Sequence, residues 1–128
     1  MKKILIIEDH SDMRELLTWQ VELVGFTAVT AKQGREGLEK AQSENLDMII
    51  LDIMMPGMDG WEAAREIRRK PATKDIPILA ATALFCDTDL KTCMESGCNG
   101  YIVKPFTFQE LQAKVKEMIP AVDTTFSR

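Results

Sequence analysis

The sequence predicts an α/β fold: a doubly wound sheet of five parallel strands with helices on both faces. Two observations support this class. Short aliphatic segments alternate along the chain with amphipathic helical patterns, and these segments are continuous rather than alternating between polar and apolar residues. Continuous apolar strands are typical of a parallel sheet that is buried on both faces. The predicted strands are Lys3–Ile7, Thr27–Ala31, Met48–Leu51, Ile76–Ala81 and Gly100–Val103.

The first two predicted helices follow the first two strands. The first is expected to end at Gly25, because glycine readily adopts the left-handed conformation that terminates a helix. Trp19 is expected to be a packing group of this helix. A second helix is predicted from about Gly34 to Ser43, with Leu38 and Ala41 facing inward. The inner face of the first helix should consist of Met13, Leu16, Leu17, Val21 and Val24.

Three more helices complete the pattern. The third is predicted to start near Trp61, a packing residue, and to end before Pro71, because the residue before a proline is disfavoured in a helix. The fifth begins at Thr107 with a capping box that includes Glu110, and Pro120 closes it. The inward residues of the third, fourth and fifth helices are expected to be Ala64 and Ile67; Leu90, Cys93, Met94 and Gly97; and Phe108, Leu111, Val115 and Met118, respectively.

Composition and charge exclude several classes of protein. Of the 128 residues, 45% are hydrophobic and 28% are charged, so disorder is not expected. The formal net charge of -4 argues against a nucleic-acid surface, and the basic cluster between Arg65 and Lys70 is interpreted as a solvated helix end. No apolar segment approaches the ~20 residues of a membrane helix, and the first is too short for a signal peptide. We therefore expect a cytoplasmic protein with no membrane or nucleic-acid partner.

The chain is expected to form one domain. Residues 1–119 hold all the strand–helix units, and residues 120–128 resemble a C-terminal tail. That tail is either a complete end or the start of a linker to an output domain.

The cysteines are expected to be reduced structural thiols. There are three of them, Cys86, Cys93 and Cys98, and their spacing does not match a zinc site. Cys86 and Cys98 flank the fourth predicted helix, which separates them too far for a disulfide.

Polar residues follow the carboxyl ends of four predicted strands, where ligands bind in an open parallel sheet. Glu8 and Asp9 follow the first strand, Asp52 the third, Thr82 the fourth and Lys104 the fifth. If the first and third strands are neighbours, three carboxylates meet and repel one another unless a cation intervenes. Carboxylate oxygens in such a site suit Mg²⁺. The alternative for Glu8 and Asp9 alone is a charge pair stabilised by the dipole at a helix N-terminus.

Thr82 and Lys104 supply groups that can bind a phosphoryl oxygen. A lysine ammonium and a threonine hydroxyl can each contact such an oxygen while Mg²⁺ neutralises another. A carboxylate beside them, here Asp52, can attack phosphorus and form an acyl phosphate. Taken singly, Thr82 is equally compatible with an ordinary buried hydroxyl, and Lys104 with a solvated charge at a strand end. Together with the carboxylates, they predict a phosphoryl-transfer site.

Five motifs in order carry a resemblance to a known family. The motifs are Ile6-Ile7-Glu8-Asp9, Asp47-Met-Ile-Ile-Leu-Asp52, Met55-Pro56-Gly57-Met58-Asp59-Gly60, Ala81-Thr82-Ala83 and Gly100-Tyr101-Ile102-Val103-Lys104-Pro105-Phe106. With these motifs, the chain resembles the receiver domain of two-component response regulators from Met1 to Ile119. The resemblance implies a flavodoxin-like (βα)5 fold with strand order 2-1-3-4-5.

The resemblance implies a role for each residue of this site. Asp52 becomes the phosphoacceptor, and Lys104 becomes the phosphoryl-binding lysine. Glu8 and Asp9 hold Mg²⁺ together with Asp52, directly or through water, and the backbone carbonyl of Met54 is a further ligand.

The resemblance also implies a switch. Thr82 would be the switch hydroxyl, and the ring of Tyr101 would move inward when that hydroxyl engages the phosphoryl group. A cis peptide bond is expected between Lys104 and Pro105. His10 has no role in this scheme and is expected to be a solvent-facing loop residue.

These inferences predict a phosphoacceptor switch of a two-component phosphorelay, which is a signalling module and not an enzyme with a separate substrate. Its partners would be a histidine kinase or a histidine phosphotransfer protein, and a downstream protein that the sequence does not identify. Three other functions stay open: a receiver-like binding module that works without phosphate, a flavodoxin-like electron carrier and a metal-dependent phosphatase. The acidic first loop disfavours the electron carrier, because an anion-binding loop needs Ser, Thr and Gly. Short loops leave little material for the substrate pocket of a phosphatase.

Overall fold

The computed structural model describes residues 2–54, 59–83 and 87–119, the last range without the side chains of residues 87–90. None of the helices in these ranges is long and apolar enough to cross a membrane. The strands are β1 (Lys3–Ile7), β2 (Thr27–Ala31), β3 (Met48–Asp52), β4 (Ile78–Thr82) and β5 (Gly100–Val103). The helices are α1 (Ser11–Val24), α2 (Gly34–Ser43), α3 (Gly60–Arg69), α4 (Asp87–Glu95) and α5 (Phe108–Met118).

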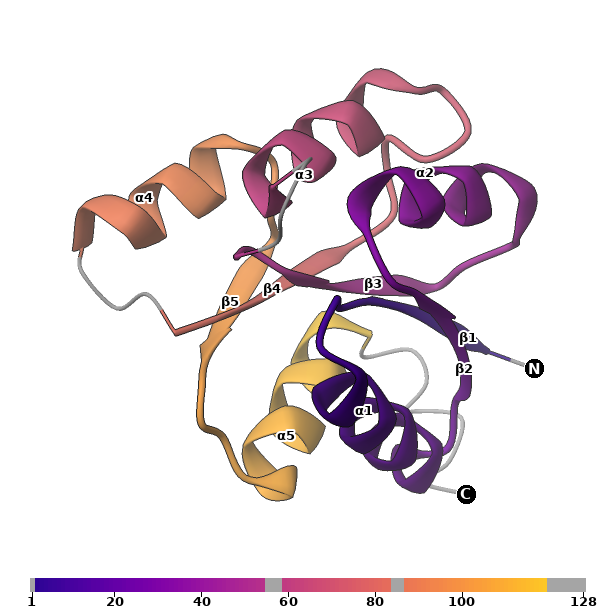
Figure 1. Ribbon diagram of the computed structural model, residues 1–128, viewed down its shortest axis with the longest axis vertical. Helices are drawn as coiled ribbons and strands as arrows, with labels where there is room; N and C mark the ends of the chain where they lie inside the picture. Colours follow the sequence, from indigo (N-terminus) through magenta and orange to yellow (C-terminus); the bar gives the residue numbers. More distant parts are fainter. Residues whose placement is uncertain (1, 55–58, 84–86, 120–128) are drawn as a thin grey trace.

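The strands form one parallel sheet in the order β2-β1-β3-β4-β5. Helices α1 and α5 cover one face, and α2, α3 and α4 cover the other (Figure 1). This arrangement confirms the predicted fold class and strand order. The direction of the strand order reverses between β1 and β3, and in doubly wound sheets the ligand crevice lies at the carboxyl ends of the strands at that point.

Alternate residues of the central strands point to the two helical layers. Leu5 and Ile7 pack with residues of α2, α3 and α4, whereas Ile4 and Ile6 pack with residues of α1 and α5. Strands β3 and β4 are buried at every position. Because both faces are covered, these strands have no polar side, which explains their continuous aliphatic sequence.

The boundaries of two strands, β3 and β4, differ from the prediction. β4 begins at Ile78 instead of Ile76, because Pro77 has no N–H for the ladder and the N–H of Ile76 is bonded within the preceding turn. β3 and β4 each extend one residue beyond the predicted end, to Asp52 and Thr82. Both candidate site residues are therefore held by the backbone ladder itself.

The predicted helix ends agree with the structure where it describes them. Gly25 follows α1 with a φ of 112°, the left-handed conformation that favours glycine. At the start of α5, the Glu110 N–H donates to the Thr107 hydroxyl at 3.1 Å and the Thr107 N–H donates to the Glu110 carboxylate at 2.8 Å, so the capping box is present. Pro120 and the predicted tail, residues 120–128, lie outside the described residues.

Two apolar side chains expected to face inward, Leu16 and Met94, are exposed instead, and so is Trp19, which was expected to be a packing group. Leu16 is 43% exposed, Trp19 67% and Met94 44%. A residue next to a buried one on a helix lies about 100° around the axis, so Leu16 cannot share the inner face that is centred near Leu17. Met94 is displaced in the same way from its buried neighbour Cys93. The buried residues of α1 are Leu17, Gln20 and Val21.

Trp61 does pack against the core, as expected. It is partly buried, and its indole N–H donates to the sulfur of Cys93 at 3.2 Å. Cys93 and Cys98 are buried free thiols, and burial raises the pKa of Cys98 to about 12. Both thiols are therefore packing groups rather than reactive ones. Cys86 and the side chain of Leu90 lie outside the described part of the chain.

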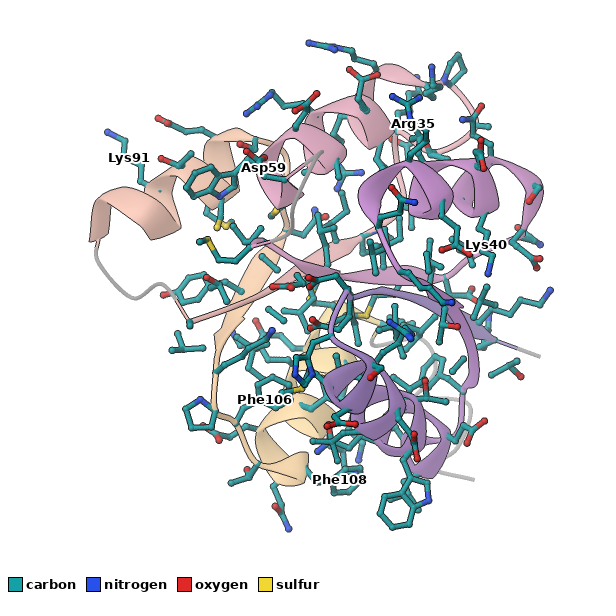
Figure 2. The ribbon with its side chains drawn as sticks, viewed as in Figure 1. Arg35, Lys40, Asp59, Lys91, Phe106 and Phe108 are labelled. Atoms are coloured by element: carbon teal, nitrogen blue, oxygen red, sulfur yellow. The ribbon has the colours of Figure 1, made fainter. Side chains whose placement is uncertain are left out.

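The start of α3 lies directly against the end of β3. Asp59, labelled in Figure 2, caps the helix by accepting the N–H of Glu62 at 2.8 Å. The N–H of Gly60 donates to the carbonyl of Ile53 at 2.9 Å. A Cβ at Gly60 would lie 2.4 Å from the Ile53 Cα and 2.6 Å from the Asp52 carbonyl oxygen, so this approach requires glycine.

Gly60→Ala should therefore lower the free energy of unfolding by about 1–3 kcal/mol, because the backbone beside Asp52 has to move. Equilibrium unfolding in urea measures this loss. Gly100→Ala is the matched control, since its Cβ would meet the Met118 sulfur at an ordinary 3.6 Å. The control should change stability by no more than about 0.5 kcal/mol. Equal losses in the two variants would contradict the importance of the close approach.

Candidate functional site

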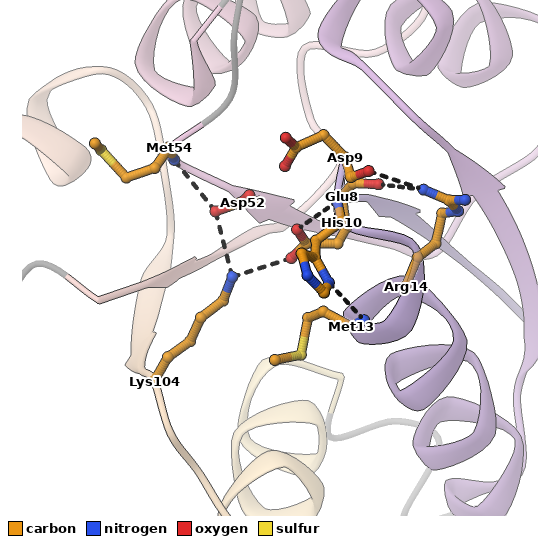
Figure 3. A network of polar contacts seen from close by, with 8 residues as sticks. All are labelled: Glu8, Asp9, His10, Met13, Arg14, Asp52, Met54 and Lys104. Atoms are coloured by element: carbon orange, nitrogen blue, oxygen red, sulfur yellow. Dashed lines mark hydrogen bonds and ion pairs between the residues drawn. The ribbon is translucent and has the colours of Figure 1, made fainter.

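The sheet brings the predicted site residues together at its carboxyl edge. Glu8 and Asp9 follow β1, Asp52 ends β3, and these two strands are direct neighbours. Carboxylate oxygens of all three residues lie within 4.8 Å of one another. Figure 3 shows them converging with the side chain of Lys104, which follows β5. The strand pairing thus produces the carboxylate cluster that the sequence predicted.

Lys104 is the cation that contacts this cluster. Its ammonium lies 3.0 Å from Glu8 Oε1 and 3.4 Å from Asp52 Oδ1, and its side chain is 19% exposed. The peptide bond between Lys104 and Pro105 is cis, as the resemblance implied. One ammonium cannot neutralise three carboxylates, and the remaining negative charge favours a divalent cation. The donors are oxygens on a partly open site, so they fit Mg²⁺.

The three carboxylates differ in their exposure to solvent. Glu8 and Asp52 are 2% and 5% exposed, whereas Asp9 is exposed. Burial raises the pKa of the Asp52 carboxyl to about 7; the charge of Lys104 opposes this increase, and Glu8 adds to it. The N–H of Met54 donates to Asp52 Oδ1 at 3.2 Å and favours the ionised form. Without a metal, the Asp52 carboxyl is therefore protonated in a large fraction of the molecules near neutral pH.

A pocket of about 350 Å³ opens over these groups. Met54 at its rim is 61% exposed. The volume is at the small end of the range for ligand sites and suits a small anion with its counter-ion. The pocket is lined by Glu8, Asp9, His10, Met13, Asp52, Met54, Ala83 and Lys104.

The two predicted switch residues lie on neighbouring strands. Thr82 is buried at the end of β4, and its carbonyl accepts the N–H of Lys104 at 2.8 Å. Tyr101 of β5 pairs with Ala80 of β4 and packs against the core cluster that contains Ala80. Ala80 and Thr82 are two residues apart on β4, so Tyr101 lies on the same face of the sheet as Thr82. Tyr101 is only partly buried, and the ammonium of Lys114 lies 5.8 Å from the centre of its ring.

Sequence reasoning missed two supporting residues. The guanidinium of Arg14 donates to the carbonyls of Glu8 at 3.0 Å and Asp9 at 3.3 Å, which holds the loop after β1. His10 is exposed as expected, but its Nδ1 also accepts the N–H of Met13 and caps α1. The role of Arg14 could not be predicted, because a long side chain that donates to backbone carbonyls has no recognisable sequence pattern. The position of His10 just before a helix could have identified the cap, although histidine is not among the preferred capping residues.

The raised pKa of Asp52 predicts that the stability of the metal-free protein depends on pH. The folded protein holds the proton on Asp52 more tightly than the unfolded chain does. The stability that this proton contributes to the folded state is therefore fully present below the unfolded pKa of 3.8, and it is lost as the pH rises through about 7. Asp52→Asn cannot ionise and should be more stable than the wild type at about pH 8, by about 2–4 kcal/mol. Urea unfolding with a chelator, repeated toward about pH 4, should show this advantage shrinking. An advantage that is constant with pH would contradict the raised pKa.

Comparison with known proteins identifies relatives of this chain. The family model of the response regulator receiver domain matches residues 4–116. The probable transcriptional regulator ycf27 of Cyanophora paradoxa is 36% identical over 97% of this chain and 53% of its own length. The chain thus spans about half the length of the curated relatives it matches.

Solved structures have the same fold. The chemotaxis protein CheY4 of Vibrio cholerae matches with a TM-score of 0.88 and 31% identity, over 92% of this chain and 98% of that one. The response regulator TrrA of Thermotoga maritima, solved in complex with Mg(2+)-BeF, matches with a TM-score of 0.82 and 42% identity, over 92% of this chain and 99% of that one. Because the family match extends from β1 into α5, the chain belongs to the response regulator receiver domains of two-component systems.

Proposed function

We propose that this receiver domain is a phosphoacceptor switch. Asp52 takes a phosphoryl group from a histidine kinase or a histidine phosphotransfer protein, and the modified domain presents a changed surface to its partner. The observation that carries this proposal is the convergence of Glu8, Asp9 and Asp52 with Lys104 at one edge of the sheet. The domain is proposed to cover residues 1–119, with residues 120–128 as a tail.

The same carboxylates are proposed to hold Mg²⁺. Glu8, Asp9 and Asp52 would be its protein ligands, with the backbone carbonyl of Met54 as a further one. When bound, the ion supplies positive charge to the phosphoryl oxygens as they approach a carboxylate. The excess of negative charge at the cluster supports this assignment, as does the Mg(2+)-BeF complex of the 42% identical TrrA.

In the proposed reaction, Asp52 is the nucleophile. A carboxylate oxygen attacks phosphorus as the bond to the donor breaks, and the product is an acyl phosphate. The ammonium of Lys104 already lies 3.4 Å from Asp52 Oδ1, so it can move from the carboxylate to a phosphoryl oxygen. Thr82, at the end of the adjacent strand, supplies a hydroxyl to another oxygen.

The switch follows from the added charge. A phosphoryl group adds about one to two negative charges at the sheet edge. The Thr82 hydroxyl turns toward it, and the ring of Tyr101 moves into the space that is vacated. The surface that responds is formed by α4, β5 and α5. The responding partner is proposed to be an attached domain or a separate protein. An attached domain is considered because relatives such as ycf27, a probable transcriptional regulator, are about twice as long.

Asp52 should be phosphorylated by acetyl phosphate in the presence of Mg²⁺ and not after chelation, because the carboxylates otherwise repel the anionic donor. Mass spectrometry of the intact protein and of its peptides measures the modification. Asp52→Asn has nearly the same shape and should not be modified. Asp47→Asn is the control, since Asp47 accepts the Lys3 N–H at the other end of β3 and should not affect labelling. Labelling of Asp52→Asn at the wild-type level would refute the assignment of the acceptor.

Thr82→Ala should still accept phosphate but should lose the response of the distant surface, because the hydroxyl links the two. Thr82→Ser keeps the hydroxyl and should respond like the wild type. NMR shift mapping with and without beryllofluoride compares the three proteins at Tyr101 and residues 91–97. Wild-type shifts that stay within the loops around Asp52 would mean that the domain signals by another route.

A further inference from the structure

The imidazole of His10 lies on the wall of the pocket that contains Asp52. In Figure 3 its ring is on the α1 side of the carboxylates, and the ammonium of Lys104 is on the β5 side. Among the described side chains that line this pocket, only these two carry nitrogen. His10 is also exposed, so a ligand that enters the pocket can reach it.

Two hydrogen bonds fix the position of His10 and the location of its ring hydrogen. The backbone N–H donates to Glu8 Oε2 at 3.2 Å, and Nδ1 accepts the N–H of Met13 at 3.4 Å. Because Nδ1 uses its lone pair as an acceptor, the neutral ring carries its hydrogen on Nε2. Nε2 makes no hydrogen bond within the described ranges. The neutral ring therefore carries an N–H donor on Nε2 at the wall of the pocket.

A donor at this place is useful because the pocket is dominated by negative charge. Lys104 is shared between Glu8 and Asp52 and cannot serve an incoming anion without leaving one of them. A phosphoryl group in transfer spreads its charge over three peripheral oxygens, and each can accept hydrogen bonds. A second side-chain donor would thus bind a phosphoryl oxygen whose negative charge Lys104 alone leaves without a partner.

We propose that His10 is a further phosphoryl-binding residue, whose Nε2–H donates a hydrogen bond to an oxygen of the phosphoryl group as it passes to Asp52. This inference rests on the proposed function of Asp52. With acetyl phosphate, the bond between an Asp52 oxygen and phosphorus forms as the phosphorus–oxygen bond to acetate breaks. Acetate leaves with the electron pair of that bond, and His10 keeps its hydrogen throughout.

Two variants separate donation from helix capping. His10→Asn places an amide oxygen near the position of Nδ1 and stays a good cap, but it has no donor at the position of Nε2. His10→Gln loses the short cap but carries an amide N–H near the position of Nε2. The two substitutions therefore change capping and donation in opposite directions.

The measurement is the second-order rate constant for Asp52 labelling by acetyl phosphate at saturating Mg²⁺, with the thermal midpoint of each variant. His10→Asn should be slower by about ten- to a hundredfold at an unchanged midpoint, which corresponds to the loss of one hydrogen bond to a charged group. His10→Gln should recover part of the rate despite a lower midpoint. The affinity of His10→Asn for beryllofluoride, measured by NMR titration, should fall by a similar factor.

A wild-type rate and a wild-type beryllofluoride affinity in His10→Asn would overturn this role. Rates that follow the thermal midpoints of the variants would also overturn it, because they would show an effect of capping alone. In both cases, labelling of the wild type leaves the function of Asp52 intact. If the wild type itself is not labelled, the proposed function fails and the role of His10 fails with it.

Discussion

The crowding of three carboxylates at the ends of β1 and β3 is the constraint on which the rest of this structure depends. Glu8 and Asp52 are buried, and a buried charge without sufficient counter-charge is costly. Lys104 offsets part of that cost. The pKa of Asp52, raised to about 7 chiefly by burial, means that the metal-free cluster can relieve the remainder by holding a proton. In the proposed function a divalent cation takes the place of that proton and leaves Asp52 ionised, which is the form that attacks phosphorus. Metal binding and nucleophilicity are then two results of one electrostatic imbalance.

The imbalance persists because the scaffold prevents the carboxylates from moving apart. The main chain of Asp52 is paired with β4, and Gly60 lets α3 begin directly against the end of β3. Arg14 lies beside Glu8 and Asp9, yet its guanidinium donates to their backbone carbonyls, and it forms no ion pair among the described residues. It therefore fixes the loop and leaves the negative charge of the side chains in place. A cation that formed a salt bridge there would stabilise the loop equally well but would weaken the site for a metal.

The fold class and the placement of polar residues at the sheet edge could be predicted from the sequence because both follow from local patterns. The strand order that brings the three carboxylates together was implied by the family resemblance instead. A continuous aliphatic segment identifies a buried parallel strand, and the polar residue after it lies at the carboxyl edge wherever that strand stands in the sheet. The exposure of Leu16 and Trp19 could not be predicted, because it depends on how α1 is rotated on the sheet, and a polar residue, Gln20, occupies part of its buried face. The role of Arg14 depends on the path of one long side chain, which has no counterpart in hydrophobic periodicity.

Lys104 also connects the carboxylate cluster to the face that carries Tyr101. Its ammonium contacts Glu8 and Asp52, while its backbone N–H donates to the carbonyl of Thr82. Tyr101 lies on the same face of the sheet as Thr82, on the adjacent strand. A change in the partner of the ammonium, or a rotation of Thr82, thus acts on strand ends that are already bonded to each other. The ring of Tyr101 is partly exposed beneath the Lys114 ammonium, and moving it inward would exchange this cation–π contact for burial. In the proposed switch, the two positions would offer different stabilising contacts, and the domain would then have the pair of discrete arrangements that phosphorylation must bias.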